Sequence, residues 1–250
     1  MKRILTLLLV LLGTFQAHGA DALSAKDLAA KLSALQQDGS SLVRLKMTTK
    51  STLQLQIKQR RTANSTEVVY QILWPKEHAG EAVLLRQTGT QAATGILFVP
   101  PATVSQLDLK QSLFGSALTY ADVLENFFAW PNQATVGTEV VNRVSCQILE
   151  SKPGKGHRSN YATVRTWVDT NRLVPLRVEK YNNAGQMMRR IDSGRIVTDD
   201  IGRHVPVGLT VTDPSKGSST ELEGSKLKHD VTFTADEFTP EGLKQRSESR

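Results

Sequence analysis

The sequence predicts one mainly-β domain, built as an antiparallel sandwich or barrel. Three observations support this fold class. Apolar and polar residues alternate along most of the chain, and turn-forming residues separate the alternating runs. The runs recur at the spacing of roughly 8–12 residues that is typical of short strands joined in a meander. The chain beyond residue 22, about 228 residues, is within the normal range for a single all-β domain.

The N-terminus has the pattern of a secretory signal peptide. A short basic region, Met1–Arg3, precedes the apolar run Ile4–Phe15, which is shorter than the roughly 20 residues that span a bilayer. Ala20–Ala22 has the small-x-small pattern of a cleavage site, and Ala17–Gly19 is a second candidate. No cysteine follows the apolar run, so no lipid anchor is expected. We therefore predict a signal peptide over residues 1–22, one domain over 23–243 and a polar tail over 244–250.

One amphipathic helix is predicted at the start of the mature chain, over residues 24–37. Ser24 and Asp27 have the spacing of a capping box. Leu28, Leu32 and Leu35 then recur on one helical face. Asp38 and Gly39 follow and are expected to end the helix.

Strands are predicted for most of the remaining chain because the apolar period changes to two. Before residue 101 the alternating segments are Leu53–Lys58, Glu67–Trp74, Leu84–Leu85 and Ile96–Val99, a four-strand meander. Turn residues separate the later segments. These are 135–142, 144–150, 161–168, 175–182, 186–197, 204–212, 218–224 and 227–234.

The segment between the two runs of strands is unusually aromatic for this chain. Thr119 and Asp122 have the spacing of a helix start, and residues 120–129 are expected to form a helix. Asp122, Glu125 and Asn126 would lie away from its apolar face. Such a helix could be part of the core, a lid over a cavity or a surface for a partner. The aromatic side chains are Phe114, Tyr120, Phe127, Phe128 and Trp130.

Composition argues against several other functions. The chain has a formal net charge of +7, but its basic residues are spread out. Its densest clusters, Lys58–Arg61 and Arg189–Arg190, are expected on solvated strand faces, without the stacking aromatics of a nucleic-acid site. The one cysteine, Cys146, lies in an alternating run and is expected to be a buried, inert thiol.

Catalytic and metal-binding patterns are not found. The chain lacks a G-x-S-x-G elbow and an H-x-x-x-H pair, and its histidines share no pattern. Asp199–Asp200 is an acidic doublet at a predicted turn. The segment Lys152–Gly156 lacks the spacing of a phosphate-binding loop, so a hairpin loop is the better interpretation. We therefore expect neither an enzyme nor a cofactor or metal site.

Several motifs together resemble the LolA-like outer-membrane lipoprotein-sorting proteins, and are most similar to their longer, divergent branch. The resemblance implies a curved, incompletely closed antiparallel half-barrel covered by short helices. It also implies a periplasmic carrier of lipoprotein acyl chains or other lipids. The motifs are Ser112–Ser116, Leu118–Asp122, Arg165–Asp169, Pro175–Tyr181, Gly185 and Asp213–Thr220.

The expected ligand is therefore a lipid or lipoprotein acyl chain, bound by a monomer that works with an inner-membrane transporter and not with nucleic acid. An envelope-stress sensor of the same fold is the alternative, and an exported hydrolase is a more distant one. The apolar cavity and its lid are expected to use Leu53, Leu55, Ile57, Tyr70, Ile72, Leu84, Ile96, Phe98, Phe127, Phe128, Val164 and Val178.

Export can be checked directly by expressing the full chain in a Gram-negative host. We expect the protein in the periplasmic fraction, shortened at its N-terminus by about 19 to 22 residues and without a covalent lipid anchor. Intact-mass measurement of the purified protein gives the cleavage position. A full-length species retained in the cytoplasm would contradict the predicted compartment.

Overall fold

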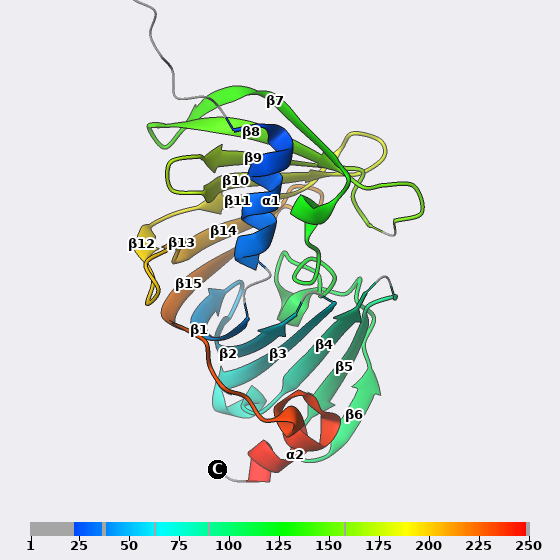
Figure 1. Cartoon of the computed structure of the whole chain (residues 1–250). Helices are drawn as coiled ribbons and strands as arrows, with labels where there is room; N and C mark the ends of the chain where they lie inside the picture. Colours follow the sequence, from blue (N-terminus) through cyan, green and yellow to red (C-terminus); the bar gives the residue numbers. More distant parts are fainter. Residues whose placement is uncertain (1–22, 37–38, 63, 90, 158, 249–250) are drawn as a thin grey trace, which may run out of the picture.

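The predicted half-barrel is confirmed by the computed structural model, which describes residues 23–36, 39–62, 64–89, 91–157 and 159–248. One antiparallel sheet of 13 strands curves through the molecule (Figure 1) in the order β6-β5-β4-β3-β2-β1-β15-β14-β11-β10-β9-β8-β7. Its end strands, β6 and β7, are not paired with each other, so the sheet stays open. The signal-peptide prediction concerns residues 1–22, which lie outside the described residues.

The elements follow one another in two runs of strands separated by an irregular stretch. The first half contains α1 (Ala25–Gln36), β1 (Ser40–Thr48), β2 (Thr52–Arg61), β3 (Ser65–Trp74), η1 (Lys76–His78), β4 (Ala82–Thr88), β5 (Thr94–Val99) and β6 (Thr103–Gln106). The middle contains the 3-10 turns η2 (Leu113–Gly115) and η3 (Phe127–Ala129). The second half contains β7 (Asn132–Val141), β8 (Val144–Lys152), β9 (Thr163–Asp169), β10 (Val174–Tyr181), β11 (Met187–Ser193), β12 (Ile196–Thr198), β13 (His204–Pro206), β14 (Gly208–Asp213), β15 (Ser218–His229), η4 (Ala235–Phe238) and α2 (Pro240–Glu248).

The predicted N-terminal helix is confirmed as α1, together with its cap. The Ser24 hydroxyl donates to Asp27 Oδ2 at 2.6 Å, and the Asp27 amide donates back to Ser24 Oγ at 3.1 Å. Leu28 and Leu32 are buried. Through them α1 packs against η3 and the β7–β8 edge of the sheet (Figure 1), where it covers part of the concave face.

The two halves of the sheet are joined by the pairing of β1 with β15, which the sequence did not predict. Strand β1 has apolar alternation at Val43, Leu45 and Met47, although it was not among the predicted strands. The prediction of two strands, 218–224 and 227–234, is wrong. Arg44 and Leu45 are consecutive in β1, but their partners in β15 are separated by one additional residue. Pairing continues on both sides of this residue, as far as His229. Because a bulge absorbs that residue, the strand needs no turn there.

Strands β3, β4 and β5 are buried on both faces. On the concave face the apolar row of β2 (Leu53, Leu55 and Ile57) packs with Val68, Tyr70 and Val83. On the convex face η4 and α2 cover a separate cluster around Phe238. The predicted placement of three residues on the concave face is therefore wrong. A strand that is apolar on both sides lacks the alternation that would show which of its faces is concave. The convex residues are Leu84, Ile96 and Phe98.

The helix predicted over residues 120–129 is also wrong. The covering segment (residues 107–131) crosses the concave face with turns and the two short 3-10 elements, η2 and η3. Its earlier part, including Leu118 and Leu124, packs on the β1–β5 half. Its later part, including Phe127 and Phe128, packs with α1 on the β8–β10 half. A single helical face could not fill two clusters on different halves of a curved sheet.

Three further predictions concern single features. The predicted burial of Cys146 is confirmed; burial also raises the pKa of its thiol, and its inertness stays a prediction. The predicted polar tail from residue 244 is helical as far as Glu248, where α2 ends. Among the described residues, no helix has the length and apolar character needed to cross a bilayer.

The convex cluster predicts a large stability cost for truncating its central ring. Phe238 is fully buried between the sheet and α2, and the Arg60 guanidinium lies 4.6 Å from its ring centroid. We expect Phe238→Ala to lower the free energy of unfolding by about 3–5 kcal/mol, measured by urea titration. Val140→Ala, at an exposed position of β7, should change it by less than about 0.5 kcal/mol. Equal effects of the two substitutions would contradict this packing.

Candidate ligand-binding site

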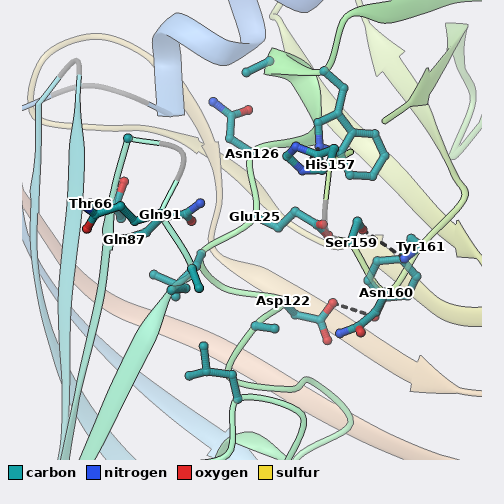
Figure 2. Close-up of a pocket in the computed structure, with 18 of the residues that line it drawn as sticks. Thr66, Gln87, Gln91, Asp122, Glu125, Asn126, His157, Ser159, Asn160 and Tyr161 are labelled. Atoms are coloured by element: carbon teal, nitrogen blue, oxygen red, sulfur yellow. Dashed lines mark hydrogen bonds between the residues drawn. The ribbon is translucent and has the colours of Figure 1, made fainter. Parts of the chain in front are cut away.

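A cavity of about 1340 Å³ lies beside the covering segment (Figure 2). One wall is formed by the ends of β2, β3 and β4, where Arg61, Thr66 and Gln87 line it. The facing wall comes from residues 121–131 of the covering segment and from the loop at 154–161. Figure 2 shows Thr66 and Gln87 across the cavity from Asp122, Glu125, Asn126 and His157.

The predicted ligand residues do not line this cavity; the structure divides them among three packed clusters. Their role in binding a ligand stays a prediction. Those on β2 and β3, Leu53, Leu55, Ile57, Tyr70 and Ile72, lie beneath the first part of the covering segment. Phe127, Phe128, Val164 and Val178 pack together with α1. Leu84, Ile96 and Phe98 are on the convex face.

A buried ion pair holds the covering segment at the cavity. Lys180 Nζ lies 2.7 Å from Asp122 Oδ1, and the two side chains are 2% and 1% exposed. The Tyr161 hydroxyl donates to the same oxygen at 2.7 Å. The amide and hydroxyl of Thr119 both donate to Asp122 Oδ2 at 2.8 Å. The predicted helix-start residues therefore bond to each other, but the carboxylate is turned into the protein interior.

A second ion pair lies next to the first. Arg189 Nη1 contacts Asp213 Oδ2 at 2.7 Å, and Arg189 Nε lies 4.0 Å from Asp122 Oδ2. Asp213 Oδ1 in turn accepts hydrogen bonds from the amide and hydroxyl of Ser215. Two cations and two carboxylates thus balance in the interior, as buried charges require.

The solvated-face interpretation of the two basic clusters is wrong for their buried members. Arg189 is enclosed by this ion-pair network, and Lys58 forms a 2.8 Å ion pair with Glu237 under the C-terminal segment. The partners are more than 20 residues away in the chain, so local sequence could not reveal them.

The charge state of Asp122 follows from these contacts. Burial alone would favour the neutral acid, but the charge of Lys180 and the hydrogen bonds from Lys180, Thr119 and Tyr161 outweigh it. They lower the pKa of Asp122 to about 2. Burial, followed by the nearby Asp122 charge, raises the pKa of Tyr161 and keeps its hydroxyl protonated as a donor. Burial also raises the pKa of Glu125, which lines the same wall.

Hydrogen bonds that involve at least one side chain attach the rest of the covering segment. Asn126 Nδ2 donates to Ser33 Oγ on α1 at 3.0 Å, and Trp130 Nε1 donates to His157 Nε2 at 3.0 Å. The Gln133 amide donates to the carbonyl of Trp130 at 2.9 Å and also to those of Phe127 and Phe128. These bonds come from α1, β7 and the 154–161 loop.

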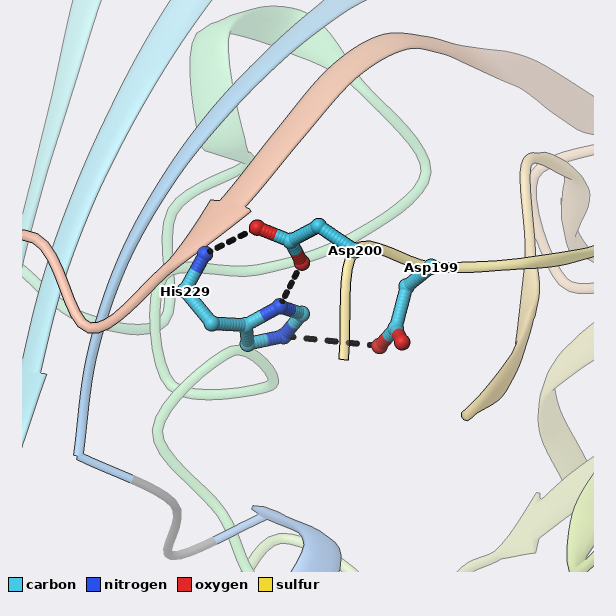
Figure 3. Close-up of side chains that lie close together, drawn as sticks. All are labelled: Asp199, Asp200 and His229. Carbon is cyan, nitrogen blue, oxygen red and sulfur yellow. Dashed lines mark hydrogen bonds and ion pairs between the residues drawn. The ribbon is translucent and has the colours of Figure 1, made fainter. Parts of the chain in front are cut away.

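A second polar cluster lies away from the cavity, at the end of β15 (Figure 3). His229 Nδ1 is 2.5 Å from Asp200 Oδ1, and His229 Nε2 is 3.7 Å from Asp199 Oδ2. One candidate ligand atom from each residue lies within 4.8 Å of the others. The Asp199 carboxylate, however, already accepts hydrogen bonds from the amides of Ile201 and Arg203. The cluster acts as a hydrogen-bonded link between the 199–203 turn and β15.

Asp122 provides a test of the buried ion pair. Asp122→Asn leaves the Lys180 ammonium buried without a counter-charge, so we expect the free energy of unfolding at pH 7 to fall by about 3–5 kcal/mol. Urea titration with a fluorescence readout measures it. The control is Glu223→Gln, which removes a 2.6 Å ion pair to Lys46 whose side chains are 51% and 66% exposed. Because water screens this pair, that loss should be far smaller than for Asp122→Asn.

Wild type and Asp122→Asn should also differ in how their free energy of unfolding depends on pH. The pKa of Asp122 is about 2 in the folded protein, against its ordinary value of 3.8. Its stabilisation is therefore complete above 3.8 and is lost as the pH falls through 2. We expect wild type to lose on the order of 2 kcal/mol more than Asp122→Asn over this range. Parallel pH dependence in the two proteins would contradict the assignment.

Comparison with known proteins supports the fold. Residues 64–245 match the sequence model of a family described as "Uncharacterized protein". No curated protein matches the chain. A DUF1329 family protein from Desulfovibrio piger has a similar structure, with a TM-score of 0.79 and 20% identity over 88% of this chain and 97% of the other. A putative outer membrane lipoprotein-sorting protein domain from Vibrio parahaemolyticus gives 0.77 and 20% over 88% and 98%.

A LolA superfamily protein from Nitrosomonas europaea is similar as well, with a TM-score of 0.67 and 18% identity over 87% of this chain and 98% of the other. These three likenesses concern the fold, and they extend over nearly the whole length of each solved chain. The family match covers well over half of the sequence. The chain therefore belongs to this family of uncharacterized proteins, and its fold is the LolA-like fold predicted from the sequence motifs.

Proposed function

We propose that the protein is a periplasmic carrier that binds the acyl chain of a lipid or lipoprotein between the concave sheet face and the covering segment. One observation carries this proposal. A large apolar face of the sheet is covered by a segment that makes almost no backbone–backbone hydrogen bonds to the strands among the described residues. Such a cover can be displaced without breaking a ladder of backbone hydrogen bonds.

The backbone bonds of the covering segment illustrate this arrangement. Among the described residues, the Leu107 amide donates to the Gly95 carbonyl of β5 at 2.9 Å. Beyond Leu107 the backbone–backbone hydrogen bonds of the described residues run within the segment itself, such as that from the Tyr120 amide to the Gln111 carbonyl at 3.1 Å. Segments with few backbone bonds to their surroundings open at lower free energy than core strands. The cover is therefore the part of the fold best suited to make room for a ligand.

The chemistry beneath the cover suits an acyl chain. The apolar row of β2 and the neighbouring residues of β3 and β4 form a continuous buried surface, the apolar floor. Leu118, Tyr120 and Leu124 of the covering segment pack against it. An alkyl chain in their place would bury the same surface, and each methylene contributes about 0.8 kcal/mol when it leaves water. The cavity at the edge of this floor, which polar side chains line at one end, would receive the other end of the ligand.

Binding accounts for the polar groups better than catalysis. Asp122, the most buried carboxylate of the cavity wall, is fully used by Lys180, Tyr161 and Thr119. His157 accepts the indole hydrogen of Trp130 through Nε2. These groups fix the position of the covering segment. The likeness in fold to a protein termed a putative lipoprotein-sorting domain supports the same role.

The proposal is tested by lipid uptake with two matched phenylalanine variants. Purified protein should bind a fluorescent fatty-acyl probe, and organic extracts of protein isolated from the periplasm should contain acyl lipid. Phe127, on the concave side, packs against α1 and the sheet, whereas Phe238 is on the convex side. We expect Phe127→Ala to weaken probe binding by at least about tenfold, the effect of losing roughly 1.4 kcal/mol of apolar contact.

Phe238→Ala is the control, because it removes the same ring from the face that the ligand does not use. Its folded fraction, determined by urea titration, should bind the probe with wild-type affinity. Unchanged affinity in folded Phe127→Ala would instead make the covering segment ordinary core. Failure of the wild-type protein to bind any acyl probe would reject the carrier function.

A further inference from the structure

Arg61 ends the apolar row of β2 on the concave side. Side chains alternate along a strand, so Arg61 lies on the same face as Leu55 and Ile57. Lys58 and Arg60 lie on the other face, where they contact Glu237 and the Phe238 ring. The guanidinium of Arg61 therefore belongs to the cavity wall and not to the convex surface.

Arg61 is part of a polar rung across three strands. Arg61 pairs with Thr66 of β3, and Thr66 pairs with Gln87 of β4. All three line the cavity. On the same face, Val68 follows Thr66 by two residues in β3, and Leu85 precedes Gln87 by two residues in β4. Both are buried in the apolar cluster. The cavity thus has a polar end that directly adjoins an apolar floor.

The hydrogen bonding of Arg61 is incomplete. Nη1 donates to the carbonyl of Gln36, the last residue of α1, at 2.6 Å. Nε is buried and has no hydrogen-bond partner among the described residues. Burial lowers the pKa of Arg61, but an arginine side chain keeps its proton at neutral pH. A buried donor that carries part of a positive charge and lacks a partner calls for an explanation.

The facing wall has the same character. Asn126 donates through Nδ2 to Ser33, while its Oδ1 is buried without a partner in the described part of the chain. Lys110 and Lys155 are exposed at the rim. The Asp122 charge is balanced by Lys180 at 2.7 Å. Glu125 is then the remaining carboxylate of the lining, against the cations Arg61, Lys110 and Lys155, and this excess of positive charge favours an anionic ligand.

We propose that the polar end of the cavity binds the phosphate of a phospholipid head group, with Arg61 as the residue that contacts it. This inference rests on the proposed function, because the acyl chains of the same lipid would occupy the apolar floor. Because Nη1 of Arg61 already donates to the carbonyl of Gln36, the donors that would contact the ligand are those of the other guanidinium edge, Nε and Nη2. That edge can donate two parallel hydrogen bonds to two phosphate oxygens.

The test compares two lipids with identical acyl chains, phosphatidylglycerol and diacylglycerol, by displacement of the fluorescent acyl probe. We expect wild type to bind phosphatidylglycerol more tightly by roughly ten- to hundredfold, the factor that a hydrogen bond to a charged group supplies. Arg61→Gln should remove this preference while leaving the affinity for diacylglycerol unchanged. Arg61→Lys, which keeps the charge but not the two-donor edge, should retain part of it.

Arg44→Gln is the matched control, since it makes the same charge change at an exposed position of β1 outside the cavity. It should keep the wild-type preference, and urea titration should show each variant to be folded. Equal binding of both lipids by wild type, or an undiminished preference in folded Arg61→Gln, would overturn the inference and leave the carrier function standing.

Two further outcomes distinguish a lipid head group from free phosphate, and a failure of this inference from a failure of the carrier function. Titration of wild type with inorganic phosphate should give an affinity at least about tenfold below that for phosphatidylglycerol, because the acyl contacts are missing. Inorganic phosphate that binds as tightly as the lipid would overturn the assignment to a head group. If neither lipid binds, the proposed carrier function fails.

Discussion

The burial of one carboxylate, Asp122, determines how the middle of this protein is arranged. An isolated charge in an apolar interior is strongly unfavourable, so Asp122 needs partners from several elements at once. Lys180 comes from β10, Tyr161 from the stretch before β9, and Arg189 from β11 brings Asp213 of β14 into the same network. The covering segment is therefore fixed to the second half of the sheet by electrostatics, although its backbone contributes almost no ladder bonds.

The two faces of the sheet are closed in different ways, and this difference matters for function. The convex face is covered by η4 and α2, whose residues Phe238 and Leu243 are fully packed. The concave face is covered by α1 and by an irregular segment that makes mostly side-chain bonds. A packed cover contributes stability, whereas a weakly bonded cover allows the same apolar surface to be exchanged for a ligand. The carrier proposal follows from this asymmetry, not from the size of the cavity.

The cavity has a polar end beside apolar surface, and this arrangement favours an amphiphile as the ligand of the proposed carrier. Arg61, Thr66 and Gln87 form this end. The next pair of residues on the same face, Val68 and Leu85, is buried in the apolar cluster. A molecule with a charged head and a long alkyl chain matches both parts. Arg61 and Asn126 line the cavity from opposite walls, and each has one buried polar atom, Nε and Oδ1, that lacks a partner among the described residues.

The sequence alone determined the fold class, because local patterns carry that information. Alternation along β2 and β3, the Ser24–Asp27 cap of α1 and the family motifs led to an open antiparallel sheet, and the structure has one. Tertiary structure alone decided the site. Local pattern could not tell the two buried faces of β4 and β5 apart, nor foresee that the Thr119–Asp122 signal would end in a buried ion pair instead of a helix. Tyr161 and Lys180, which contact Asp122, and Gln36, which contacts Arg61, lie more than 20 residues away in the chain, and only the folded sheet brings them together.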